Sequence, residues 1–178
     1  MKILSNCWIL LLILPLTLLA GEDKYPKSVF TIGAGFNSFS SSDPEQRGRN
    51  GGNYGRIEIL QKIRIPVGIS ASLAYDLCPV CDGTGGEYVA AYSIVAQFVP
   101  FRYPFQFLTG LGYATGNNPK KDGSEGDFGG LNFPLIARLL YSFRTSNTHF
   151  AIGAEFSLDL NNTNNVLAVG LPIQWGVW

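Results

Sequence analysis

Residues 56–76 read RIEILQKIRIPVGISASLAYD, and this stretch decides the fold. Apolar side chains occupy almost every odd position, whereas charged and small side chains occupy most even positions. Successive side chains leave a β-strand on opposite faces, so this alternation predicts strand structure. Pro66 lies at the midpoint and predicts a tight reversal, because proline cannot donate a backbone N–H to a ladder. The stretch is therefore expected to be a β-hairpin with one apolar face and one polar face.

The same alternation recurs in six further segments, so the sequence predicts eight strands in all. The six segments are residues 28–39, 88–99, 103–113, 131–143, 148–158 and 165–178. The connections after the second, fourth and sixth strands are short, namely Pro66, 100–102 and 144–147. The other connections are longer and polar, namely 40–53, 78–87, 114–130 and 159–164. Short turns at one end and long loops at the other are typical of bacterial outer-membrane barrels.

Residues 1–20 have the composition of an export signal. Lys2 supplies a positive charge, an apolar run leads to Ala20, and the chain turns polar at Gly21. The apolar run is short for a helical membrane span, which needs ~20 residues. We therefore expect a signal peptide over residues 1–20 and one barrel domain over residues 21–178. An even number of strands would place both termini of this domain in the periplasm.

Composition limits the classes of partner. The chain has 178 residues, a formal net charge of zero and 15% charged residues. The neutral charge gives no sign of nucleic-acid binding. A soluble domain typically carries ~25% charged residues. This chain therefore has few side chains with which to build a water-facing surface.

Two architectures accommodate eight alternating strands. A soluble barrel of the lipocalin type has its apolar face inside, and a membrane barrel has that face outside. The interior of an eight-stranded barrel is only just wide enough to be filled by side chains. The bulky side chains of the apolar phase would overfill this interior, whereas the Gly, Ala and Ser of the other phase fit it. The predicted fold is thus an all-β, eight-stranded, antiparallel up-and-down transmembrane β-barrel with its apolar phase outside.

The phase that faces the lumen carries eight charged residues, four of each sign. They are Arg56, Glu58, Lys62, Arg64, Asp76, Arg138, Glu155 and Asp159. Four of each sign are too few to solvate a barrel exterior. An unpaired buried charge is costly, so we expect these residues to form a paired lumen charge network.

In these features the chain resembles the small eight-stranded outer-membrane barrels, the group of the OmpA transmembrane domain and OmpX. The resemblance covers residues 28–178 and rests on the export signal, the eight strands, the alternating loop lengths and the aromatic C-terminal residue Trp178. It implies insertion by the barrel assembly machinery. It also implies contact with outer-membrane lipids and lipopolysaccharide.

Few residues suggest chemistry. Cys78 and Cys81 remain after loss of the signal, and in an oxidising compartment this pair is expected to form a disulfide. A redox or metal role would need a second such pair or a neighbouring histidine. His149 is the sole histidine; it lacks the following serine expected of a lipid A deacylase and is expected at the periplasmic interface. We therefore expect no catalytic residue, no cofactor and no metal ion.

The function expected from the sequence is that of a non-enzymatic membrane anchor. Its surface loops would contact a host or matrix ligand or lipopolysaccharide, or would support envelope integrity. A narrow porin-like conduit, gated by the lumen charges, is the alternative. A lipid A-modifying enzyme has the least support.

Overall fold

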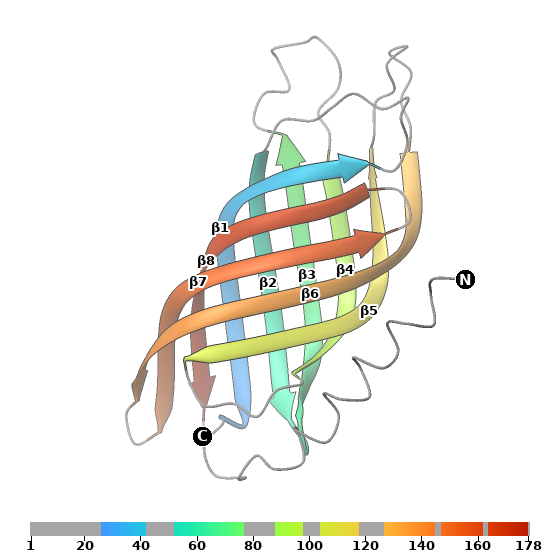
Figure 1. The fold of residues 1–178 in the computed structure, drawn as a ribbon. Coiled ribbons are helices and arrows are strands. Elements are labelled where there is room, and N and C mark those ends of the chain that lie inside the picture. The colour runs from blue at the N-terminus through green and yellow to red at the C-terminus, as the bar shows by residue number, and fades with distance from the viewer. Residues whose placement is uncertain are drawn as a thin grey trace, which may run out of the picture.

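The barrel predicted from the sequence is confirmed by a computed structural model, which describes residues 26–41, 52–76, 88–97, 104–117, 127–144, 147–161 and 164–177. The eight strands are β1 (Ser28–Ser41), β2 (Gly52–Lys62), β3 (Pro66–Asp76), β4 (Tyr88–Gln97), β5 (Phe105–Asn117), β6 (Asp127–Arg144), β7 (Thr148–Asn161) and β8 (Asn164–Val177). Each strand pairs antiparallel with the next, and β8 pairs with β1, so the barrel is closed (Figure 1). Among the described residues, no helix is long and apolar enough to cross a bilayer.

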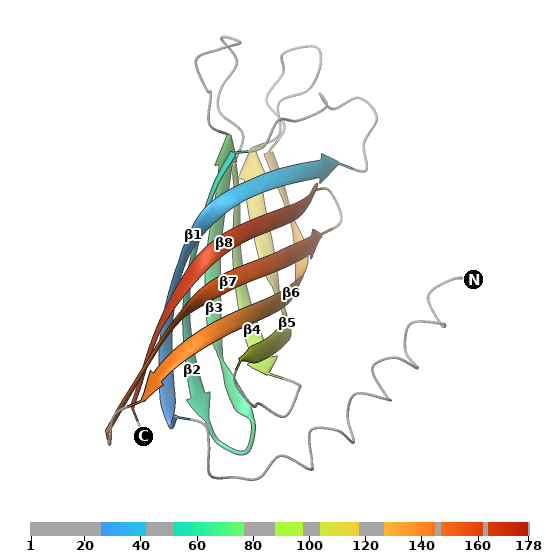
Figure 2. The same ribbon diagram turned by 60° about the vertical axis from the view of Figure 1, so that its left-hand side comes forward.

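The register fixes the slant of the strands. A series of paired residues that starts at Ser28 passes once around the barrel and returns to β1 at Ser38, ten residues further along (38 − 28). For eight strands, with ~3.3 Å per residue and ~4.8 Å between strands, this stagger corresponds to a tilt of roughly 40°. The slant is clear in the strands that face the viewer in Figures 1 and 2.

Several predicted connections need correction, and the one between β5 and β6 consists of residues 118–126 rather than 114–130. The β2–β3 turn consists of residues 63–65, and Pro66 is the first residue of β3, paired with Lys62. The first position of a strand suits proline, because a missing N–H is tolerated there. The connection between β7 and β8 is not a long loop but residues 162 and 163, since both strands extend further than the alternation predicted.

Two prolines interrupt the ladders. Pro134 is paired with a residue of β7. On the other side of β6, the pairing with β5 stops after Thr109 and Leu135 and resumes at Gly112 and Asn132, so it skips Pro134. Similarly, Pro172 pairs with β1, and the β7–β8 pairing skips this position. Each gap falls on one side of the proline, where its nitrogen has no hydrogen to donate.

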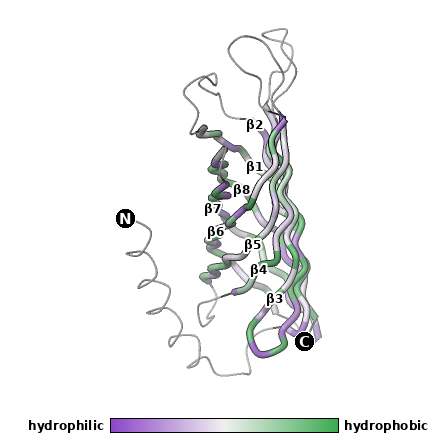
Figure 3. The backbone as a smooth tube through the Cα atoms, turned by 90° about the vertical axis from the view of Figure 1, so that its right-hand side faces the viewer, coloured by the Kyte–Doolittle hydropathy of each residue, from purple (hydrophilic) through white to green (hydrophobic). Residues whose placement is uncertain are grey.

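The outer wall of the barrel is apolar, as predicted. The bulky side chains of the apolar phase are exposed on it, for example Phe36 at 68%, Ile69 at 62% and Leu171 at 66%. Figure 3 shows hydrophobic and hydrophilic residues following each other along the strands. This orientation is that of a membrane barrel and the reverse of a lipocalin-type barrel.

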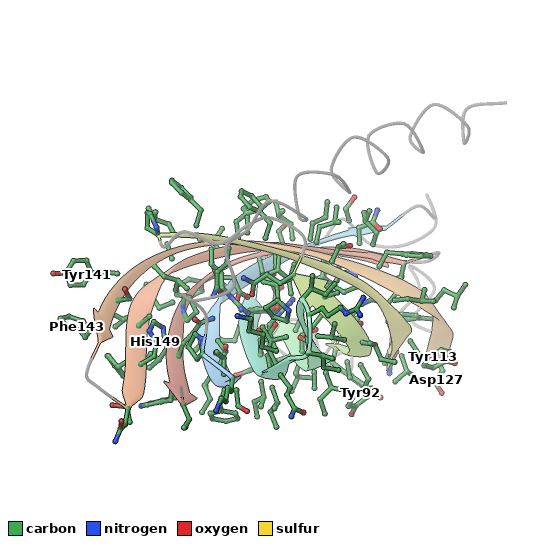
Figure 4. All side chains as sticks on the ribbon, turned by 90° about the horizontal axis from the view of Figure 1, so that it is seen from below. Tyr92, Tyr113, Asp127, Tyr141, Phe143 and His149 are labelled. Carbon is green, nitrogen blue, oxygen red and sulfur yellow. The ribbon has the colours of Figure 1, made fainter. Side chains whose placement is uncertain are left out.

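Aromatic rings form a band on the outer wall at the turn end of the barrel. Trp175 lies between Phe30 and Phe150, with ring centroids 6.0 and 5.9 Å away. The band continues from Phe150 to Phe143 at 6.0 Å and from Phe143 to Tyr141 at 4.9 Å. It therefore crosses β1, β8, β7 and β6, and Figure 4 shows its last two rings pointing away from the barrel. Aromatic girdles of this kind mark membrane–water interfaces.

Candidate functional site

Five charged side chains meet inside the barrel and alternate in sign. Glu58 binds Arg138 with a 2.8 Å ion pair, and Arg138 binds Glu155 at 2.7 Å. Glu155 lies 3.4 Å from Arg56, which binds Asp159 at 3.2 Å. Each of the five residues is at most 3% exposed. We call this series, from Glu58 through Arg138, Glu155 and Arg56 to Asp159, the charge chain.

Strand register positions the charge chain. Arg138 of β6 is paired directly with Glu155 of β7, and both side chains point inward. The successive register partners of Arg56 on β3, β4 and β5 are small residues, namely Ser72, Ala91 and Ala114. Because their side chains are short, they leave space in the lumen for the guanidinium of Arg56.

Neutral donors surround the Asp159 end of the chain. Ser72 Oγ donates to Asp159 Oδ2 at 3.3 Å, and Asn132 Nδ2 donates to Asp159 Oδ1 at 3.3 Å. Asn132 Nδ2 also donates to Ser93 Oγ at 3.2 Å. Asn132 reaches Ser93 across β5 because the residue between them is Gly112, where an added Cβ would overlap Ser93 Oγ.

Tyr54 completes the network at Arg56. Its hydroxyl accepts a hydrogen bond from Arg56 Nε and another, of 3.2 Å, from Ser157 Oγ. The guanidinium carbon of Arg56 lies 5.4 Å from the ring centroid of Tyr54. Every charge in the chain thus has an opposite charge beside it, as a buried ion needs, although Arg56 Nη1 and Glu155 Oε1 make no hydrogen bond to the described residues.

Two apolar clusters occupy much of the rest of the described interior. An apolar cluster fills the loop-end half, formed by Phe39, Tyr54, Ala74, Val89, Ala91, Ala114, Val166 and Ala168. A second cluster lies towards the turn end, formed by Val29, Leu60, Val95, Leu108 and Ile136. Nearer the turns, Gln106 and Gln174 exchange hydrogen bonds of 3.3 and 2.8 Å. A water-filled channel would leave such residues accessible, whereas these are buried.

The eight charged residues that were predicted to face the lumen lie in several different environments in the structure. Arg56, Glu58, Arg138, Glu155 and Asp159 form the charge chain. Lys62 is half-buried at the turn end of β2, and the side chain of Asp76 is not among those described. The prediction for Arg64 is wrong: this residue lies in the β2–β3 turn and is exposed, because the turn leaves the ladder that directs side chains inward. Among the side chains that the structure describes, the charge chain therefore has three carboxylates and two guanidiniums.

Other expected features fall elsewhere. His149 lies at the turn end of β7, as predicted, but it is 2% exposed and points into the barrel (Figure 4). Cys78, Cys81, Trp178 and residues 1–20 lie outside the described residues. Within the part that the structure describes, no group of three or more His, Cys, Asp or Glu side chains could hold a metal ion.

The sequence analysis missed the neutral members of the network, Tyr54, Ser72, Asn132 and Ser157. Tyr54 lies two residues before the predicted start of the hairpin. The alternation does place Ser72, Asn132 and Ser157 in the phase predicted to face the lumen, but it gives them no partners. Only their contacts across the barrel required the structure.

Comparisons with known proteins concern the fold. No protein-family model matches the sequence, and no curated protein is similar to it. The neisserial surface protein A is similar in structure, with a TM-score of 0.51 and 16% identity over 83% of this chain and 96% of that chain. Ail of Yersinia pestis is less similar, with a TM-score of 0.49 and 16% identity over 84% of this chain and 97% of that chain. The N-terminal barrel of Pseudomonas aeruginosa OprF is less similar again, with a TM-score of 0.45 and 13% identity over 84% of this chain and 98% of that chain. The chain thus has the fold of the small eight-stranded outer-membrane β-barrels, as its alternation predicted.

Proposed function

We propose that this protein is an exported, non-enzymatic outer-membrane barrel that anchors surface loops. Residues 1–20 act as the signal, and residues 21–178 form the barrel domain. The apolar outer wall and its aromatic band support the membrane location. Residues 42–51, 77–87 and 118–126, which connect strands at one end, are the proposed contact surface for a host or matrix ligand or for lipopolysaccharide.

The single observation that carries this proposal is the occupied lumen behind an apolar wall. An enclosed, paired charge chain between two apolar clusters obstructs the described lumen, which suits an anchor better than a pore. A conduit would need a continuous polar path, and opening one would separate ion pairs that are costly to break. Function then depends on the loops that the barrel presents.

Location and topology can be tested together. The full chain is expressed with Cys78→Ser and Cys81→Ser, and a single cysteine is introduced as Gly51→Cys in a loop or Arg64→Cys in a turn. We expect both proteins in the outer-membrane fraction, with heat-modifiable gel mobility. A membrane-impermeant maleimide should label intact cells only at position 51. A chain that is soluble without detergent, or labelling at position 64, would contradict the proposal.

Conductance separates the anchor from the conduit. We expect planar bilayers that contain the purified barrel to remain silent over a physiological voltage range. Reproducible single-channel steps, absent from a mock preparation, would favour the conduit.

A further inference from the structure

Two lysines lie side by side at the turn end of the barrel, where β1 begins and β2 ends. The register that pairs Ser28 with Gln61 continues to Lys27 and Lys62, and Lys62 N donates a hydrogen bond of 2.8 Å to the carbonyl oxygen of Lys27. Like charges on directly opposite residues of neighbouring strands destabilise a sheet. A negative charge beside the two lysines would remove this penalty.

Both lysines follow the phase that faces the lumen. Lys62 comes two residues after the buried Leu60, and Lys27 comes two residues before the buried Val29. Lys62 is half-buried and Lys27 is exposed. The two side chains therefore belong to the turn-end mouth of the lumen rather than to the lipid-facing wall. Figure 4 looks into this mouth from below, with His149 pointing inward.

The described residues near this mouth are basic or neutral. They contain no Asp or Glu over residues 26–30, 60–68, 95–97, 104–108, 140–144, 147–151 and 174–177. Arg144, the last residue of β6, is instead the register partner of His149. Farther inside, the carboxylates of the charge chain are already paired with Arg56 or Arg138. None of these described carboxylates is therefore left to neutralise the lysines.

A buried glutamine without partners lies in the same row of the register. Pro66 pairs with Lys62 on one side, and the register of β3 with β4 brings Gln97 next to Pro66 on the other. Gln97 is 1% exposed, and neither the nitrogen nor the oxygen of its amide has a hydrogen-bond partner. Gln106 and Gln174, which are also buried, satisfy each other. A buried polar group without a partner is costly, so the amide of Gln97 indicates a bound group that the described side chains do not supply.

The donors in this row suit a small oxyanion. Lys27, Lys62 and Gln97 come from three strands, so they can donate to different oxygens of one group. A tetrahedral phosphate presents oxygens on all sides, and hydrogen bonds from ammonium groups to it are charge-assisted. The interior of an eight-stranded barrel is only just wide enough for side chains, so a large polyanion is excluded.

We propose that the turn-end mouth binds one phosphate group, held by the ammonium groups of Lys27 and Lys62 and by the amide nitrogen of Gln97. Binding neutralises the paired lysines and gives the buried amide a partner. Inorganic phosphate and the headgroup of an anionic phospholipid both present this group. The inference needs the closed barrel and not the anchor function proposed above.

The test uses the full chain in dodecyl maltoside micelles at low ionic strength, titrated with inorganic phosphate and followed by calorimetry. Gln97→Leu removes the amide, and Gln61→Leu is the matched control because Gln61 is exposed on the outer wall. We expect one saturable phosphate on the unaltered protein and on Gln61→Leu, and about tenfold weaker binding to Gln97→Leu, equivalent to ~1.4 kcal/mol. Lys62→Gln should weaken binding to a similar extent. Arg64→Gln, which removes the same charge from the exposed turn, should weaken it by less than about twofold.

Unfolding in phosphate-free urea separates lost binding from misfolding. Gln97→Leu removes an unpaired buried amide, so its midpoint should be no lower than that of the unaltered protein. A titration with dihexanoyl phosphatidylglycerol identifies the source of the phosphate group. Tighter binding of this lipid, weakened by Gln97→Leu, would assign the mouth to a headgroup, whereas tighter binding of inorganic phosphate would assign it to the free anion.

Three results would overturn the inference. The first is that neither probe binds saturably, and the second is that Gln97→Leu and Gln61→Leu bind phosphate equally. In both cases water is the partner of Gln97. The third is phosphate that binds only after Glu22→Gln and Asp23→Asn, since the mouth would then belong to carboxylates of the chain itself. Failure of the proposed anchor function looks different, because a chain that needs no detergent would contradict that function whether or not it binds phosphate.

Discussion

Replacing Arg138 by methionine removes the cation that holds two carboxylates inside the barrel. Arg138 donates to both oxygens of Glu58, at 2.8 and 3.2 Å, and to Glu155 at 2.7 Å. In Arg138→Met, Glu58 loses its ion-pair partner and Glu155 keeps only Arg56 at 3.4 Å. Removing one partner of a buried ion pair costs about 3–5 kcal/mol. A domain is stable by only ~5–15 kcal/mol, so we expect loss of a large fraction of the free energy of unfolding.

The measurement is urea unfolding of the barrel in lipid vesicles, followed by tryptophan fluorescence and by the gel mobility of unheated samples. Linear extrapolation gives the free energy of unfolding in water. Arg64→Met is the matched control, because the same substitution falls on an exposed turn residue and should change stability by less than about 0.5 kcal/mol. Equal stability of the two variants would refute an enclosed Arg138.

A second substitution tests the cause of the loss. Glu58→Met added to Arg138→Met removes the carboxylate left without its partner. Replacing a buried ion pair by apolar side chains of similar size is often nearly neutral. We therefore expect the double variant to recover at least about 2 kcal/mol relative to Arg138→Met. A double variant that is less stable than the single one would show that the loss comes from packing and not from the uncompensated charge.

Three further substitutions, one of them with a matched control, examine the wall and the charge chain, and all are measured by the same unfolding assay. Gly68→Ala places a methyl group against the backbone carbonyl of Ile59 and should cost about 1–3 kcal/mol, whereas Gly55→Ala meets nothing within 4 Å and should be nearly neutral. Trp175→Ala removes two ring contacts of the aromatic band and should cost roughly 1–3 kcal/mol; a change below about 0.5 kcal/mol would mean that the band adds no stability. Asp159→Asn removes the excess negative charge and keeps a side-chain oxygen for Ser72, so it should cost less than about 1.5 kcal/mol, and a loss as large as that of Arg138→Met would contradict this charge count.

The sequence predicted the strands and their orientation because one period runs through the whole barrel. The three-residue turn after Lys62 pairs odd residues with odd ones, so the alternation of β2 continues unbroken into β3. The same continuity hid the position of the turn, since nothing in the alternation separates Ile63 or Arg64 from the strands. The loop ends of the strands were not predicted accurately, because the side chains that face inward near the loops include the apolar Phe39 and Tyr54. With apolar residues in both phases, the alternation between apolar and polar side chains is lost there.

The partners within the charge chain could not be predicted from alternation. Alternation places Glu58 and Arg138 in the lumen, but their contact spans the barrel from β2 to β6, which are not neighbours in the sheet. It depends on the stagger of ten residues, and the stagger is a property of the whole circuit of pairs. No single strand encodes it.

This cross-barrel pairing suggests what the charges contribute. Ala, Gly and Ser fit the lumen at many positions, so a strand shifted by two residues, which keeps the same face inward, would meet little steric resistance from them. A shift of β6 by two residues would move Arg138 by roughly 7 Å along the strand and separate it from Glu58 and Glu155, which would leave buried charges without partners. The charge chain therefore penalises wrong registers even if it adds little net stability to the right one. We expect Glu58→Met with Arg138→Met to fold into vesicles with a broadened unheated band, while Arg64→Met gives one sharp band; a sharp band and full yield for the double variant would show that the ladder and the turns set the register alone.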